Sequence, residues 1–189
     1  MVLRRVLKPA VFILALVPAA LLVRGMLRGD LGINPAETIQ LETGRWTFKF
    51  LLLTLAVTPV RRLTGWNPVI QFRRMLGLFA FFYGTLHLTT YVWLDKFFDW
   101  QEILKDVAKR RYITAGFSAF VLMIPLAVTS TAWAIRRLGG PRWRRLHQLI
   151  YVSAIAGVIH YYWLVKSDVR LPLMYAAIVA VLLVYRFVV

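Results

Sequence analysis

Apolar residues fill long stretches of the chain, and short arginine-rich segments separate these stretches. Six of them stand out, each near the ~20 residues that a helix needs to cross the hydrocarbon core of a bilayer. They cover residues 6–24, 46–60, 74–94, 112–132, 147–165 and 171–189. The pattern predicts an all-α integral membrane protein, in which six transmembrane helices form a helical bundle in one domain over residues 1–189.

One further segment, residues 97–104, mixes apolar and charged residues at helical spacing. This pattern is typical of a short helix that lies on a membrane surface. We expect it on the outer surface, where it offers a docking face for a partner protein.

The amino-acid composition supports a membrane protein and excludes several kinds of cofactor and catalytic site. Hydrophobic residues make up 60% of the chain, more than the roughly one half that is usual in soluble domains. The net charge of +16 comes with arginines clustered in short loops, which argues for membrane topology and against nucleic-acid binding. Cysteine is absent, which excludes disulfides, iron–sulfur clusters, thiol catalysis and covalently attached c-type haem.

The distribution of charge predicts the orientation in the membrane. Lysine and arginine occur without any acid at the N-terminus and in the loops after the second and fourth apolar stretches. We therefore expect both termini on the cytoplasmic side of a bacterial inner membrane. The carboxylates are expected in the other three loops, and they are Asp30, Glu37, Glu42, Asp95, Asp99, Glu102, Asp106 and Asp168.

The chain has three histidines, His87, His147 and His160, and all lie in or at the ends of apolar stretches. Glycine precedes two of them by three residues, as Gly84 and Gly157. Positions i and i+3 share a helix face, so each glycine removes bulk beside an imidazole and lets a flat porphyrin approach the backbone. Close helix packing is the alternative reading. The repeated pattern beside two buried histidines favours haem.

His87 and His160 are predicted at the same depth, about two turns from the outer ends of their helices. This depth allows both imidazoles to ligate one b-type haem between two helices. Zinc would need further ligands, which no intramembrane cysteine or carboxylate supplies. His147 lies 13 residues before His160 on one predicted helix, which is ~20 Å of rise but ~220° of rotation. Both imidazoles would share a face only if a local bulge intervened.

Arg73 and Arg74 lie at the start of the third apolar stretch, Arg73 just before it and Arg74 as its first residue, on its predicted cytoplasmic side. They have an ordinary reading as positively charged flanking residues. The alternative is that one of them binds the propionates of an inner haem whose axial ligand is His147. Guanidinium suits this task because it has donors and no lone pair for iron.

Several stretches together resemble a known family. These are Asn34-Pro35-Ala36-Glu37, Thr43-Gly44-Arg45, Arg73-Arg74-Met75-Leu76-Gly77, Leu86-His87-Leu88-Thr89, Ala127-Val128-Thr129-Ser130-Thr131, Trp143 with Leu146-His147, and His160-Tyr161 with Trp163. With them the chain resembles the MsrQ (YedZ) family, haem-binding membrane subunits of the periplasmic methionine sulfoxide reductase system, in the ferric-reductase-like transmembrane superfamily.

The resemblance implies b-type haem, one or two, on His87, His147 and His160, and it allows an FMN. It also implies electron delivery to a periplasmic molybdopterin-containing subunit that reduces methionine sulfoxide in oxidised proteins. Relatives that reduce iron or oxygen carry a nucleotide-binding domain after the sixth helix, whereas this chain ends at Val189. The expected donor is therefore membrane quinol or a cytoplasmic flavin reductase, and the chain is an electron-transfer subunit, not the catalytic reductase.

Two other functions stay open at this stage. A proton or ion transporter would use the same buried histidines as a relay, but the predicted spans hold no aspartate or glutamate to support one. A structural assembly subunit is the second alternative, and no sequence feature argues against it.

Overall fold

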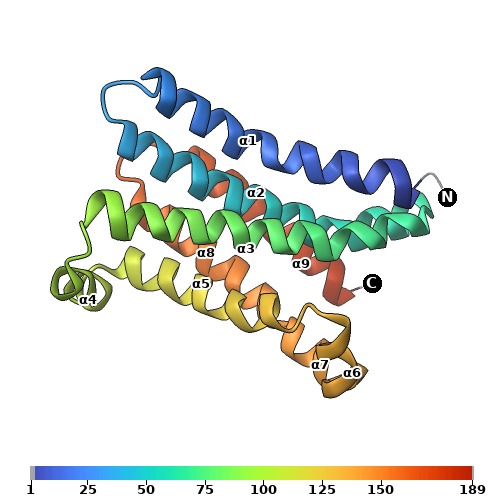
Figure 1. The fold of residues 1–189 in the computed structure, drawn as a ribbon. Coiled ribbons are helices and arrows are strands. Elements are labelled where there is room, and N and C mark those ends of the chain that lie inside the picture. Colours follow the sequence, from blue (N-terminus) through green and yellow to red (C-terminus); the bar gives the residue numbers. More distant parts are fainter. Residues whose placement is uncertain (1–2, 189) are drawn as a thin grey trace. The chain divides into compact units, whose positions relative to one another are not determined.

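The computed structural model describes residues 3–188, and these residues form helices and turns without a strand. The predicted all-α class is therefore confirmed for the described part of the chain. The helices form two compact units, Met1–Phe98 and Asp99–Val189, which are described separately below and drawn in Figure 1.

The first unit contains three long helices, α1 (Lys8–Arg28), α2 (Pro35–Thr64) and α3 (Arg73–Thr90). Short helices flank them, namely η1 (Leu3–Leu7), η2 (Asn67–Phe72) and η3 (Tyr91–Asp95). α2 and α3 run side by side (Figure 1). In the aromatic core between them, the centroid of the Phe50 ring is 5.3 Å from that of the Tyr83 ring and 5.5 Å from that of the Phe79 ring.

Tyr83 joins α1 to this core through two hydrogen bonds. Its hydroxyl donates to the Ala15 carbonyl at 2.8 Å and accepts from the Ala19 N–H at 3.1 Å. In an uninterrupted helix these two backbone groups would bond to each other, but Pro18 lies between them and disturbs the turn. The inserted hydroxyl therefore satisfies backbone groups beside the proline and ties α1 to α3.

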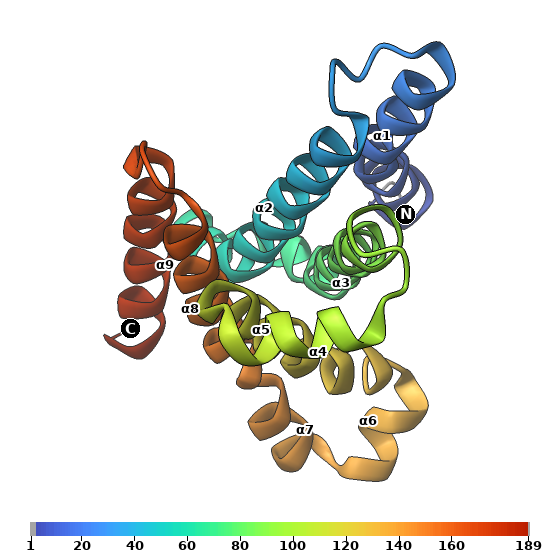
Figure 2. The same ribbon diagram turned by 90° about the vertical axis from the view of Figure 1, so that its left-hand side faces the viewer.

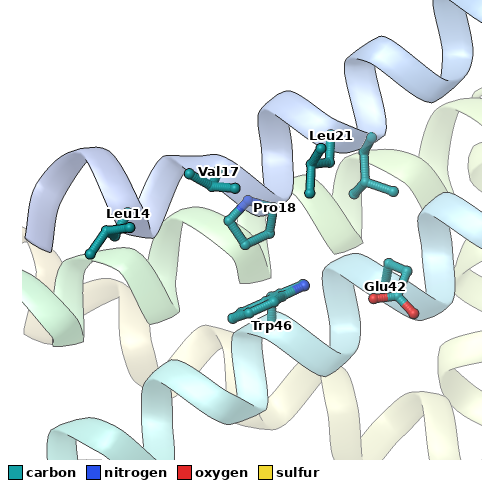
Figure 3. Close-up of a pocket in the computed structure, with 7 residues that line it drawn as sticks. Leu14, Val17, Pro18, Leu21, Glu42 and Trp46 are labelled. Carbon is teal, nitrogen blue, oxygen red and sulfur yellow. The ribbon is translucent and has the colours of Figure 1, made fainter.

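A cavity of about 450 Å³ lies between α1 and α2 (Figure 3). Its lining is apolar apart from the Glu42 carboxylate, and the Trp46 ring faces Pro18 across it. This lining matches the hydrocarbon of a bilayer, and it includes none of the three histidines.

The second unit contains two long packed helices, α5 (Arg111–Val128) and α8 (Leu149–Leu164). Around them lie α4 (Trp100–Lys109), α6 (Ala132–Leu138), α7 (Gly140–His147) and α9 (Arg170–Val188). Ser153 is fully buried between α8 and α5, where its hydroxyl donates to the Ala119 carbonyl at 2.8 Å. α9 packs beside α8 (Figure 2).

Helix boundaries depart from the predictions in three places. α2 begins at Pro35 and not near residue 46, because Asn34 caps it by accepting from the Glu37 N–H and proline suits the first helical turn. Glu37 and Glu42 are therefore helical, not in a loop. α5 ends at Val128, just after Pro125, and α6 and α7 replace the rest of the predicted loop.

Predicted span 147–165 is also divided. α7 ends at His147 and α8 begins at Leu149, with Gln148 in a turn between them. The turn is tight, because the N–H groups of Gln148 and Tyr151 both bond to carbonyls three residues back. The two histidines thus lie on helices separated by the single residue Gln148, and its tight turn changes the rotation expected for one ideal helix.

Three helical segments among the described residues are long and apolar enough to cross a membrane, Arg5–Arg28, Asn67–Asp95 and Arg111–Val128. They correspond to three of the six predicted spans. α8 has 16 residues, and Lys49 interrupts the apolar part of α2. The other three spans remain predictions. The short helix predicted over residues 97–104 is found as α4, which begins at Trp100 after the cap residue Asp99 and continues to Lys109; its place on the outer surface remains a prediction.

Candidate functional site

His87 lies on α3 and is held by the backbone of α2. Its Nδ1 is 2.9 Å from the carbonyl oxygen of Gln40. The ring lies against Gly44, one helical turn further along α2, so closely that a Cβ built there would be 3.0 Å from Cε1 and 3.1 Å from Nδ1. The imidazole therefore occupies the space that a side chain at position 44 would take.

His160 lies on α8 and is held in the same way by α5. Its Nδ1 is 2.7 Å from the carbonyl oxygen of Tyr112. The ring lies against Gly116, again one turn after the bonded carbonyl, and a Cβ built there would be 2.6 Å from Nδ1. Each unit thus contains a pair of long helices in which one supplies a histidine and the other supplies a carbonyl and a glycine.

This arrangement fixes the tautomer of both rings. A carbonyl oxygen can only accept a hydrogen bond, so Nδ1 must carry the hydrogen in His87 and in His160. In the neutral ring the lone pair is then on Nε2. Metal-binding histidines are typically oriented by such a bond from the other ring nitrogen to a carbonyl or carboxylate. In this tautomer Nε2, and not Nδ1, is the ring nitrogen with the lone pair that a metal ligand needs.

Gly44 and Gly116 are the residues that sequence reasoning missed. The sequence pointed instead to glycines on the histidines' own helices. Gly84 is buried in α3, and Gly157 is partly buried in α8. Their predicted role beside a porphyrin remains a prediction. The separations of 43 residues from Gly44 to His87 and 44 from Gly116 to His160 do not by themselves select this pair, because the contact depends on the register between two packed helices.

His147 has a different environment at the end of α7. Its ring stacks on Trp143 with 3.9 Å between ring centroids, and its Nε2 is 3.0 Å from the Thr129 hydroxyl oxygen. Thr129 donates its own hydroxyl hydrogen to the Pro125 carbonyl and accepts from the Trp143 indole N–H at its backbone oxygen. Nε2 of His147 is therefore the donor to Thr129, which is the opposite tautomer from the other two histidines.

Arg73 and Arg74 occupy the first turn of α3. Arg73 is partly buried and Arg74 is exposed. Arg73 and His87 lie on one continuous helix, and their separation of 14 residues corresponds to ~21 Å of helix rise. Their role toward a cofactor remains a prediction.

The donor set suits haem better than a bare metal ion. No group of three or more histidine, cysteine, aspartate or glutamate side chains able to hold a metal is found among the described residues. Haem iron needs only one or two axial ligands from the protein, because the porphyrin supplies the others. Gln40, whose backbone carbonyl bonds to His87, also has a buried side-chain oxygen, Oε1, that receives no hydrogen bond from the part of the chain that the structure describes. Such an atom is expected to meet a polar group of a ligand or a water.

Comparison with known proteins agrees with this chemistry. Residues 43–158 match the family described as "Ferric reductase like transmembrane component". A 55% identical relative from Herminiimonas arsenicoxydans aligns with 95% of this chain and 84% of its own length. It is named "Protein-methionine-sulfoxide reductase heme-binding subunit MsrQ". The chain belongs to the MsrQ family.

Other MsrQ relatives are similar to the chain at comparable levels. The relative from Azospira oryzae is 51% identical over 96% of the chain, and that from Rhodospirillum rubrum is 50% identical over 95%. These alignments cover 78% and 86% of the relatives. No solved structure matches the chain. Membership in the MsrQ family confirms the resemblance and, with the apolar helices, makes this a membrane protein.

Proposed function

We propose that this chain is a b-type cytochrome that carries electrons across the bacterial inner membrane. Its donor is membrane quinol or a cytoplasmic flavin reductase. Its acceptor is a periplasmic, molybdopterin-containing methionine sulfoxide reductase subunit, which repairs oxidised proteins. One observation carries this proposal: His87 and His160 each have Nδ1 bonded to a backbone carbonyl of a neighbouring helix.

His87 and His160 are the proposed axial ligands of one haem near the outer membrane surface. Their expected equal depth supports the pairing, and so does their common tautomer. Nε2 of each ring would bind the iron while Nδ1 stays bonded to Gln40 or Tyr112. When bound, haem supplies reversible one-electron chemistry, while the protein sets its orientation and electronic environment.

The surrounding helices keep both rings in one orientation. A hydrogen bond and a glycine contact from the facing helix restrict each imidazole, so the ring does not need to be ordered again when iron binds. Two neutral imidazoles also add no charge to an apolar site. These properties suit electron transfer, which proceeds best when ligands move little between oxidation states.

His147 is the proposed ligand of an inner cofactor, either a second haem or an FMN. A haem near the outer surface leaves most of a ~30 Å hydrocarbon core uncrossed, so an electron needs an intermediate step. Arg73, with Arg74 beside it, is the proposed partner for a propionate or a flavin phosphate. Ligation through Nε2 would require His147 to release Thr129, whereas ligation through Nδ1 would keep that bond.

Visible spectroscopy of histidine variants tests the outer site. Purified wild-type protein should show a strong Soret band and sharp reduced bands of low-spin haem. His87→Ala and His160→Ala should each remove the same haem, because a six-coordinate site cannot form with one imidazole missing. His147→Ala is the comparison variant and should keep the low-spin bands of the outer haem, while any inner haem that His147 binds is lost.

The haem-to-protein ratio from a pyridine haemochrome assay completes the experiment. The pairing is wrong if one of the two outer variants keeps full low-spin haem while the other loses it. A wild-type protein that binds no haem would reject the cytochrome and leave the transporter or the assembly subunit.

A further inference from the structure

We propose that Gly44 and Gly116 are positioning residues for the two axial histidines, and that each acts by exposing the backbone carbonyl one turn earlier on its helix. This inference rests on the proposed haem ligation by His87 and His160. It assigns a role to α2 and α5, the helices that face the histidines, and predicts how these helices tune the iron.

Helix geometry explains why the residue must be glycine. Side chains in an α-helix tilt toward the N-terminus, so the side chain at position n+4 lies beside the carbonyl of residue n. Gly44 is four residues after Gln40, and Gly116 is four residues after Tyr112. Without a Cβ at these positions, an imidazole from the neighbouring helix can lie flat on the helix and reach the carbonyl.

The contact distances show that the histidine rings occupy the space that a Cβ at position 44 or 116 would need. A Cβ at position 116 would be 2.6, 2.9 and 3.0 Å from three atoms of the His160 ring, and one at position 44 would be 3.0 and 3.1 Å from two atoms of the His87 ring. Real Cβ atoms essentially never approach another heavy atom closer than 3.0 Å. An alanine at 116 must therefore displace the imidazole, whereas at 44, where the contacts are tight but not below 3.0 Å, the ring has to move by only a few tenths of an ångström.

General close packing of helices does not explain these two positions. Gly77, on α3, is also a helical glycine that faces a neighbouring helix, but a Cβ there would meet Thr54 at an ordinary 3.6 Å. Alanine fits at that position. Gly77 is thus a matched control from the same unit as Gly44, and a Cβ there would contact Thr54 and not a histidine.

The carbonyl bond should also affect the iron electronically. Donation from Nδ1–H to a carbonyl makes Nε2 a stronger base, and loss of such an outer bond typically costs 10- to 100-fold in metal affinity. A stronger imidazole donor favours ferric over ferrous iron. Weakening the bond should therefore raise the reduction potential of the outer haem. His147, which donates from Nε2, should not show this behaviour.

The first experiment measures tautomers in the full-length apoprotein and needs no variant at either glycine. ¹⁵N NMR of histidine-labelled protein in detergent distinguishes Nδ1–H from Nε2–H rings, and His→Ala variants assign the three signals. We expect Nδ1–H for His87 and His160 and Nε2–H for His147. An Nε2–H ring at His87 or His160 overturns the inference.

The second experiment titrates hemin into full-length Gly44→Ala, Gly116→Ala and Gly77→Ala proteins and measures their reduction potentials. We expect affinity to fall about 10- to 100-fold for the first two, more strongly for Gly116→Ala, with a raised potential wherever haem binds. Gly77→Ala should behave like wild type, and far-UV circular dichroism of each apoprotein verifies the helices.

The outcomes separate the two proposals. Wild-type affinity and potential in both Gly44→Ala and Gly116→Ala would overturn the positioning role, while loss of haem in the histidine variants would still support the cytochrome. Equal losses in Gly77→Ala would also overturn it, because they would indicate general packing. Full haem binding in His87→Ala and His160→Ala would reject the ligation itself.

Discussion

Replacing Tyr83 by phenylalanine should destabilise the first unit through one missing oxygen atom. The ring is fully buried and stacks on Phe50 with 14° between ring planes, so phenylalanine keeps the packing. The hydroxyl, however, serves the Ala15 carbonyl and the Ala19 N–H at once. A buried polar group left without its partner costs about 1–3 kcal/mol.

The two backbone groups can recover part of that cost by bonding to each other. We therefore expect a total loss of about 1–3 kcal/mol, not twice that range. The assay is equilibrium unfolding in mixed micelles, followed by far-UV circular dichroism, with Tyr162→Phe as the control because Tyr162 is 45% exposed. A loss for Tyr83→Phe no larger than that of the control would refute the bridging role of the hydroxyl.

Three further predictions concern packing, the inner site and topology. Ser153→Ala should lower the free energy of unfolding by about 0.5–1.5 kcal/mol in the same assay, because a hydrogen bond is lost. Ser153→Leu should lower it further, because the position is fully buried and has no room for a larger side chain. Equal losses for the two variants would contradict this packing. With Nδ1 of His147 as the ligand, Thr129→Val should slow reduction of the outer haem by the physiological donor in stopped-flow measurements without changing the spectrum of the outer haem, because it removes the bond that orients the His147 ring. An unchanged or faster rate would contradict ligation through Nδ1. Reporter fusions at Gly65 and Gly139 should report cytoplasm and fusions at Asp99 the outer side, and the reverse pattern would invert the proposed electron flow.

Much of the helical architecture followed from the sequence. Apolar stretches predicted α1, α3 and α5 as spans, because hydropathy is a sum over neighbouring residues and a bilayer fixes the length required. The three histidines were also identified by sequence, since ionisable side chains are rare in such stretches. Helix ends were less certain. The cap at Asn34 and the tight turn at Gln148 depend on local hydrogen bonds that hydropathy does not measure.

The environment of each histidine was decided by tertiary structure. The sequence directed attention to Gly84 and Gly157, because only residues on the histidine's own helix have a known geometric relation to it. Gly44 and Gly116 are more than 40 residues away in the chain, and their contact depends on the register between two packed helices. That register also selects Nδ1 as the hydrogen-bond donor in His87 and His160 and Nε2 in His147. Composition and spacing do not encode this choice, because it arises only when a carbonyl, or for His147 a hydroxyl, from another part of the chain comes within hydrogen-bonding distance of the ring.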